Sequence, residues 1–369
     1  MTDHDADAVR RVAATPDPAL VARIASRMPL RYRAGADPSL DRPAHVRAGS
    51  GVALLGRRLA VVQDDANFLA LVEPRSGVVD AVPLPAGPGG LRQFDDGRAN
   101  KADKLDLEAR VAVPGDERGG LRLLAFGSGS TARRERVAEA RGLDGAAPAL
   151  DGAAAALDGA AAALTLHELP AFYAALRAVP AFAGSELNVE GVLYVAGAGG
   201  GPPRLRLFGR GNGAARGPLE AINATCDVDW RALDAHMARP ADHPPPRPRA
   251  IVRYDLGAIG GVPLGFTDAA SGPRGAVLYA AAAEASPDAT RDGDVAGSAL
   301  GVIVGDAHGS VTARWAVVRD AGGEPFAGKI EGLVTTRESP ARCWAVVDGD
   351  DPAAPSELCL VELEGPWYG

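Results

Sequence analysis

A short repeated pattern constrains the fold of this chain more than any other feature of its sequence. Four segments each combine an apolar run with one acidic residue, and they are KLDLEARVAV (Glu108), ELNVEGVLYV (Glu190), PLGFTDAASG (Asp268) and GKIEGLVTT (Glu331). The segment GSGVALL takes the same place in an earlier unit, with Ser50 or Gly51 instead of the acid. Each segment precedes a second apolar run that ends in a polar loop, and a third apolar run follows. Such a repeat predicts a fold built from similar β-rich units.

The units begin near residues 50, 106, 188, 263 and 329, and each contains three or four predicted strands. Small antiparallel sheets repeated in this way are typical of β-propellers, in which each unit is one blade around a central axis. We therefore predict an all-β fold, a β-propeller of five blades, with six blades as the alternative. The last unit shows three clear strands, so residues 30–33 are expected to supply its fourth and close the ring. A pair of β-sandwiches would leave the recurring acid unexplained.

Length and composition agree with a modular fold rich in turns. The chain has 369 residues, which is more than a single hydrophobic core usually holds. Its 46 Gly and 29 Pro residues indicate frequent turns. The net charge of −8 disfavours nucleic acid as a partner, because phosphate binding needs a basic field.

The sequence shows neither a signal peptide nor a membrane span. The N-terminal region is charged and lacks the apolar region of a secretory signal, and no run of about 18 apolar residues occurs. Cys226, Cys343 and Cys359 are too few and too scattered for a disulfide framework or a zinc cluster, and Cys226 is expected in a buried strand. These features predict a cytoplasmic protein without a membrane partner, and the bias towards Arg over Lys suggests a bacterial source.

The N-terminal region is predicted to be helical and separate from the propeller. Leu20, Val21 and Ile24 share one face of a helix, and Asp17-Pro18 has the composition of a helix start. We expect a helical arm over residues 1–29 and the propeller over residues 30–369.

Three further segments interrupt the strand pattern. Residues 143–163 are an Ala-rich segment of low complexity, predicted to be a surface insertion. Residues 169–178 have the spacing of a short amphipathic helix that Pro180 ends. Residues 239–249 are rich in proline and predict a stiff connector.

The repeated acids mark the candidate site. The first strand of each blade lines the channel of a propeller, so the four acids are expected at one depth around the axis. Carboxylates this close raise one another's pKa, and a cation, a lysine or shared protons must balance them. We consider three roles for this ring: a metal site, a catalytic or ligand-binding ring without metal, and a structural ring that bonds the backbone of neighbouring blades. Ca²⁺ is the expected metal, because it prefers oxygen ligands.

Polar loops and lysines supply the candidate ligand-binding residues. The chain contains only three lysines, and all of them lie close before Glu108 or Glu331. The Gly-rich loops 127–130 and 210–213 have the composition of anion-binding turns, with ordinary hairpin turns as the alternative. The candidates are Asp64, Asp65, Lys101, Lys104, Ser128, Ser130, Arg133, Asn188, Arg210, Asn212, Glu284, Asp292, Ser298, Lys329, Asp348 and Asp350.

Several common catalytic motifs are missing from the sequence. It contains no GxSxG, no Walker A loop, no HExxH and no CxxC. The six histidines do not cluster at the spacing of metal ligands. We therefore expect neither a nucleotide nor an organic cofactor.

The order of the short motifs resembles a bacterial protein family of unknown function. The resemblance covers residues 48–364 and rests on SGVALL, QDDANF, KADKLDLEA, FGSGS, LNVEGV, RGNG, LGFTDAA, KIEGL and DGDDP. The strands that contain Glu-Gly are more distantly similar to phytase-like and esterase-like propeller proteins. That resemblance implies a propeller, often with calcium, and hydrolysis of phosphoesters or esters.

The leading hypothesis is a pocket at one mouth of the channel that acts on a small anionic or polyhydroxylated molecule. In it, Glu108, Glu190, Asp268 and Glu331 bind Ca²⁺ or act as acid and base. The expected activity is a Ca²⁺-dependent hydrolase of a phosphoester, ester or lactone. The alternative is a non-catalytic propeller that binds a ligand or a protein.

Overall fold

The computed structural model describes residues 9–115, 120–143, 163–197, 200–291, 293–305 and 310–369. These residues form 22 strands and three short α-helices, so the all-β class is confirmed. No helix in this part of the chain is long and apolar enough to cross a membrane.

Two four-stranded antiparallel sheets stand alone. The first contains β3 (Gly49–Leu55), β4 (Arg58–Gln63), β5 (Phe68–Glu73) and β6 (Val78–Pro83). The second contains β7 (Leu107–Pro114), β8 (Leu121–Gly127), β9 (Arg136–Arg141) and β10 (Ala163–Glu168).

The remaining strands form a 14-stranded sheet that joins three further units of the same kind. One unit contains β11 (Val189–Val195), β12 (Arg204–Gly209), β13 (Asn223–Asp229) and β14 (Arg249–Asp255). The next contains β16 (Val262–Ser271), β17 (Val277–Glu284), β18 (Val295–Gly305) and β19 (Val311–Arg319), with the short β15 (Ala258–Ile259) at its edge. The last contains β20 (Lys329–Thr335), β21 (Arg342–Asp348), β22 (Glu357–Glu364) and β2 (Val21–Pro29). The N-terminal strand β1 (Arg10–Pro16) pairs in parallel with β14 and β19 and so links two of these units.

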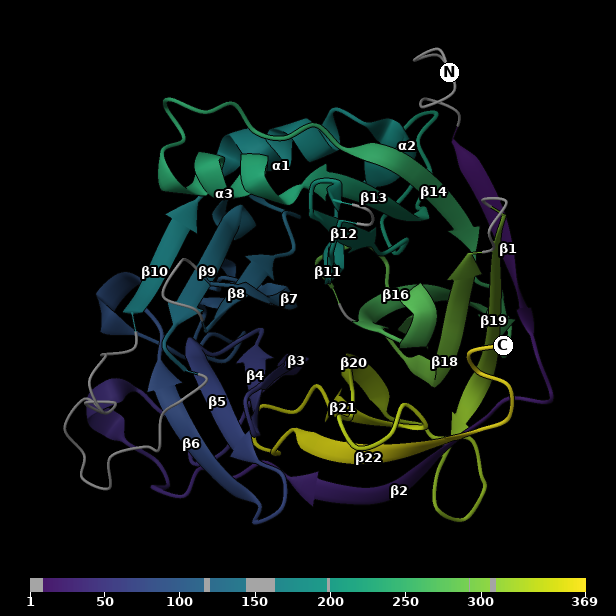
Figure 1. Ribbon diagram of the computed structural model, residues 1–369. Helices are drawn as coiled ribbons and strands as arrows, with labels where there is room; N and C mark the ends of the chain where they lie inside the picture. Colours follow the sequence, from purple (N-terminus) through teal and green to yellow (C-terminus); the bar gives the residue numbers. More distant parts are fainter. Residues whose placement is uncertain (1–8, 116–119, 144–162, 198–199, 292, 306–309) are drawn as a thin grey trace.

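The first strands of the units enclose the centre of the molecule. Each packs against the next in the cycle β3, β7, β11, β16, β20 and back to β3. Figure 1 shows the sheets arranged around this common axis. The arrangement is propeller-like, as the repeat predicts, and it brings the repeated segments of the sequence together.

The prediction of a helical arm is wrong for residues 9–29, which contain β1 and β2 and no helix, and residues 1–8 lie outside the described residues. Strand β2 pairs antiparallel with β22, from Val21 opposite Glu364 to Pro29 opposite Glu357. Ala22 and Ile24 are buried in this strand, which is the alternation of a sheet. The fourth strand of the last unit is therefore β2 and not residues 30–33. The spacing of the apolar residues in this segment fits both a helix and a strand, and pairing with β22 makes it a strand.

Short helices fill the periphery between units. The predicted amphipathic helix is confirmed as α1 (Pro170–Arg177), and α2 (Pro180–Ala183) follows it at once. The sequence analysis did not predict α3 (Trp230–Ala238), whose first turn is capped by the side chain of Asp229. Short 3₁₀ turns occupy Pro38–Leu40, Pro88–Gly90, Lys101–Asp103, Ala132–Arg134 and Pro273–Gly275.

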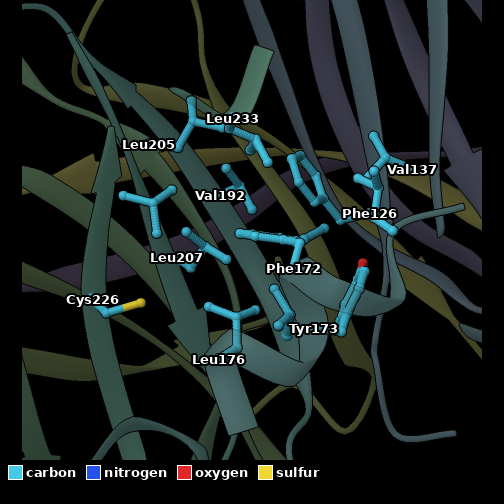
Figure 2. Packing of buried hydrophobic residues seen from close by; sticks show 14 of the residues in the cluster. Phe126, Val137, Phe172, Tyr173, Leu176, Val192, Leu205, Leu207, Cys226 and Leu233 are labelled. Atoms are coloured by element: carbon cyan, nitrogen blue, oxygen red, sulfur yellow. The ribbon is translucent and has the colours of Figure 1, made fainter. Parts of the chain in front are cut away.

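The core lies between neighbouring units. Figure 2 shows Phe172 and Tyr173 of α1 packed between side chains of two sheets, with Phe126 on one side and Leu207 on the other. Cys226 is buried in β13 in this cluster, as predicted.

Two predicted loop segments give different outcomes. Most of the Ala-rich insertion, residues 144–162, lies outside the described residues. The Pro-rich connector lies between α3 and β14 and contains no helix or strand before Arg249.

Candidate functional site

The five first strands share one irregularity at the same point. In each, one residue is skipped by the ladder to the second strand, and these residues are Ser50, Glu108, Glu190, Thr267 and Glu331. A bulge of this kind re-aims a side chain. The equivalent of the acid in the first unit is therefore Ser50 and not Gly51.

Asp268 does not belong to this ring, and the expectation that all four acids share one position is corrected for it. The bulged residue of β16 is Thr267, whose hydroxyl donates to the carbonyl of Ile330 at 2.6 Å. Asp268 follows it and pairs with Arg110 of β7 through two hydrogen bonds of 2.7 and 2.5 Å. The sequence could not separate the two residues, because one position of register moves a side chain to the other face.

Arg110 and Asp268 form a buried plug that joins four of the five first strands. The Nε of Arg110 donates to the carbonyl of Val52 in β3 at 2.6 Å, and Nη2 donates to the carbonyl of Leu333 in β20. Asp268 also accepts from the backbone N–H of Leu333 at 2.5 Å. Burial raises the pKa of Asp268 to about 7, although Arg110 favours its charged form. The plug is therefore structural.

A polar pocket of about 310 Å³ opens where the first strands begin and the second strands end. It gathers fourteen of the predicted site residues, which are Asp64, Asp65, Lys101, Lys104, Glu108, Asn188, Glu190, Arg210, Asn212, Glu284, Lys329, Glu331, Asp348 and Asp350. The polar loops after the second strands thus meet the repeated acids at one mouth, as the repeat predicts.

Five other predicted residues do not line the pocket. Asp268 lies in the plug, and Ser298 bonds the backbone of Gly328 and Ile330. Arg133 is half-exposed and pairs with Asp103. The remaining two, Ser128 and Ser130, bond Asp106 and Arg134, which leaves this Gly-rich loop committed to protein groups. Asp292 lies outside the described residues.

The sequence analysis missed Asp106 and Arg134, which line the pocket together with Asp95, Asp96 and Asp351. Arg134 Nη1 contacts Oδ2 of Asp106 at 2.8 Å. Asp106 precedes Glu108 by two residues, as Lys329 precedes Glu331, and this spacing was the signal that could have identified it.

Two lysine side chains balance the charge of the carboxylates that line the pocket. Lys104 Nζ lies 2.6 Å from Asp64 Oδ2 and 2.8 Å from Asp106 Oδ1. Lys329 Nζ lies 2.6 Å from Glu331 Oε1 and 3.0 Å from Glu284 Oε2. Both lysines are buried, and each bridges two carboxylates.

All three lysines of the chain line this one pocket. The other 36 basic side chains are arginines, most of which lie elsewhere. Lysine carries a compact ammonium with three donors, whereas the planar guanidinium of arginine needs more room. Arg134, Arg210 and Arg291 line the same pocket, so lysines and arginines share the task of balancing its acids.

The pocket holds carboxyl groups in two different states. Burial raises the pKa of Glu108 well above its ordinary value, and Asp64, Asp106 and Glu190 add repulsion. Burial likewise raises the pKa of Glu190 to about 8, against the influence of Arg210. The pKa of Glu284 is lowered to about 2, because Arg210 and Lys329 outweigh its burial. Protonated and ionised carboxyl groups thus lie side by side near neutral pH.

Glu190 should make the protein less stable as the pH rises. Its pKa of about 8 exceeds the ordinary 4.5, so between these values the folded protein holds a proton that the unfolded chain releases. Its stabilising contribution is complete below pH 4.5 and is lost as the pH rises through 8. Denaturant unfolding from pH 5 to 9 should show a steeper decline for the native protein than for Glu190→Gln. Parallel curves would contradict the assignment.

The residues fit a metal ion only in part. Ligand oxygens of Asp64, Asp106 and Glu108 lie within 4.8 Å of one another, and Ca²⁺ takes such ligands. Lys104 already contacts two of these three carboxylates, and its ammonium occupies the place between them that a divalent ion would take. The cation of this cluster is therefore Lys104.

The fold and the site define a propeller-like protein with an acid- and lysine-lined pocket at one mouth of its channel. Over residues 45–363 the chain matches the model of a family of unknown function (DUF6929), and it belongs to that family. The predicted resemblance to a family of unknown function is thereby confirmed. No curated protein matches the chain.

Solved structures of low sequence identity are similar to the chain over most of its length. MPT-4, a mannose phosphorylase from Leishmania mexicana in complex with phosphate, is 13% identical over 92% of this chain and 88% of that one, with a TM-score of 0.42. The WD40 repeats of RRP9 are 10% identical over 87% and 96%, with a TM-score of 0.37. A protein of unknown function from Dyadobacter fermentans is 12% identical over 95% and 100%, with a TM-score of 0.36.

Proposed function

We propose that the pocket hydrolyses an ester or lactone bond of a small polyhydroxylated molecule by acid–base catalysis. The observation that carries this proposal is that one pocket holds two kinds of carboxyl environment, the crowded one of Glu108 and the lysine-paired one of Glu331. Carboxyl groups whose environments differ are a recurring basis of acid–base catalysis. We also take the five four-stranded units as the blades of a five-bladed propeller, closed by β2.

Glu108 is the proposed general acid. It lines the pocket, and burial together with repulsion from other carboxyl groups raises its pKa well above the ordinary value, which favours the protonated form that a general acid needs. No described residue donates a hydrogen bond to it, so its oxygens remain open to a ligand. It would donate a proton to the leaving oxygen as the bond breaks.

Glu331 is the proposed general base. Lys329 contacts Oε1 of Glu331 at 2.6 Å. Oε2 would then take a proton from the attacking water. Glu190 and Asn188 line the same pocket and are hydrogen-bonded to each other, and they would orient the substrate.

Calcium enters this proposal only as the alternative to Lys104. No step above uses a metal, because the ammonium already balances Asp64 and Asp106. Phosphoesters are the less favoured substrates, because the basic residues that line the pocket are paired with carboxylates.

The test is a hydrolysis assay of the purified protein on ester, lactone and phosphoester panels. Glu108→Gln should lower kcat about 10²–10⁴-fold, the range for loss of a general acid, and leave KM nearly unchanged. Glu168→Gln, an exposed change in β10, is the matched control and should keep full activity. Turnover retained in Glu108→Gln would remove the acid role. No turnover on any panel would favour the non-catalytic binding alternative.

A further inference from the structure

The described basic residues of the pocket have little charge left for a ligand. Each Lys and Arg among them already contacts a carboxylate of the protein. The contacts are Lys101 to Asp96 at 3.6 Å, Lys104 to Asp64 at 2.6 Å, Arg134 to Asp106 at 2.8 Å, Arg210 to Glu284 at 2.5 Å, Arg291 to Asp288 at 2.7 Å and Lys329 to Glu331 at 2.6 Å.

Several carboxylate oxygens, in contrast, have no donor among the described residues. Asp64 Oδ1 and Asp65 Oδ1 are buried without a hydrogen-bond partner. Glu190 is only 5% exposed, and it accepts from Asn188 and Arg210 through Oε1 alone. Its Oε2 is left to the pocket that the residue lines. A buried acceptor without a donor costs free energy. At Asp64 and Asp65 a ligand donor recovers it when the carboxyl group turns its buried oxygen towards the pocket that both residues line.

These acceptors adjoin one another. Asp64 and Glu108 belong to the cluster whose oxygens lie within 4.8 Å, and Asp65 follows Asp64 in the loop after β4. Glu190 is the neighbouring ring acid, close enough to repel Glu108. We call Asp64, Asp65, Glu108 and Glu190 the acceptor arc. A single small ligand group could contact several of its members.

We propose that the ligand is a cationic polyhydroxylated molecule, such as an amino sugar, whose protonated amine binds to the acceptor arc. An ammonium offers three donors and a positive charge, which matches several uncommitted carboxylate oxygens. Hydroxyl groups of the same ligand would bond Asn188 and Asn212. The proposal takes its location from the proposed function but needs no catalysis.

The overall charge of the lining supports a cation over an anion. Twelve of the described lining residues are acidic and six are basic. An anionic ligand would have to break ion pairs such as Lys329 with Glu331 before it gained a partner. A neutral polyol would satisfy the acceptors but would leave the negative charge unbalanced.

Proton release is a second consequence of the proposal. Burial and repulsion from neighbouring carboxyl groups raise the pKa of Asp64 well above its ordinary value, which favours its protonated form in the absence of ligand. An arriving ammonium replaces that proton as the balancing charge. Binding of a cation should therefore tighten as the pH rises and should release protons, whereas a neutral polyol should release none.

The experiment compares three ligands of one shape on the wild-type protein by titration calorimetry. D-Glucosamine, D-glucose and D-glucuronate carry positive, neutral and negative charge, respectively. We expect glucosamine to bind about tenfold or more tightly than glucose, the worth of one charge-assisted hydrogen bond, and glucuronate to bind most weakly. Titrations in buffers of different ionisation enthalpy report the proton release.

Variants then locate the amine. Asp64→Asn and Asp65→Asn should reduce the preference for glucosamine over glucose, whereas Asp80→Asn, in β6 outside the pocket, should not. Equal affinities, tighter binding of glucuronate, or no binding of any of the three at tens of millimolar would overturn the proposal. Loss of turnover in Glu108→Gln with an unchanged order of affinities would support both proposals. Retained turnover in Glu108→Gln with the same order of affinities would remove the acid role alone.

Discussion

Replacement of Arg110 by Met should destabilise the protein by about 3–5 kcal/mol, because it leaves Asp268 buried without its partner. Arg110 has 4% and Asp268 0% of the side chain exposed, so water cannot replace the lost hydrogen bonds. The variant also loses the contacts of Arg110 with Val52 and Leu333, which hold β3 and β20 at the centre. Denaturant unfolding measures the loss as a lower midpoint.

The control for this prediction is Arg133→Met, which removes an arginine that is half-exposed and paired with Asp103. It should cost less than about 1 kcal/mol, as exposed ion pairs do. The Arg110→Met penalty should also grow between pH 5 and 9, because an unpaired Asp268 must then ionise in the core. A double variant, Arg110→Met with Asp268→Leu, should recover part of the loss. An Arg110→Met protein as stable as the native one would remove the structural role of the plug.

Replacement of Lys104 by Ala should destabilise the protein by about 3 kcal/mol and create a dependence on divalent cations. The change leaves Asp64 and Asp106 without the ammonium that bridges them at 2.6 and 2.8 Å, a loss typical of a broken buried pair. It also vacates the space among the three carboxylates that Ca²⁺ could use. Thermal unfolding in EDTA and in excess Ca²⁺ measures both effects.

Calcium at a hundredfold excess over its Kd should restore about 2.7 kcal/mol to Lys104→Ala and leave the native protein unchanged. Lys101→Ala is the control, because Lys101 is one-third exposed and lies 3.6 Å from Asp96 at the rim of the pocket. It should gain no calcium dependence. A native protein that calcium stabilises as strongly as it stabilises the variant would overturn the assignment of Lys104 as the cation and would return calcium to the site.

The pattern of the sequence predicted the architecture and most of the pocket. Each repeated unit carries its acid at the start of the first strand and its polar loop at the end of the second, and a sheet brings those two ends to one edge. The sequence pattern alone was therefore enough to predict that Asp64, Arg210 and Asp348 lie in one pocket with Glu108 and Glu331. Local order along the chain was sufficient here, because neighbouring antiparallel strands bring such positions together.

Tertiary structure decided two features that the local sequence pattern leaves open, the secondary structure of one segment and the orientation of one acid. The segment that forms β2 has an apolar spacing that suits a helix, and it becomes a strand because β22, more than 300 residues away, offers it an unpaired edge. Asp268 resembles the ring acids in sequence, yet a bulge one residue earlier turns it towards Arg110. Such register is set by the partner strand and not by the residue itself.

The sequence by itself thus determined that similar β units would gather acids and lysines at one mouth of a channel. Which carboxylate each lysine bridges, and which oxygens stay open to a ligand, was decided only when five units closed around one axis. The physical reason is range: hydrophobic alternation and turns act between neighbours in the chain, whereas Lys104 reaches Asp64 across 40 residues and Arg110 reaches Asp268 across 158.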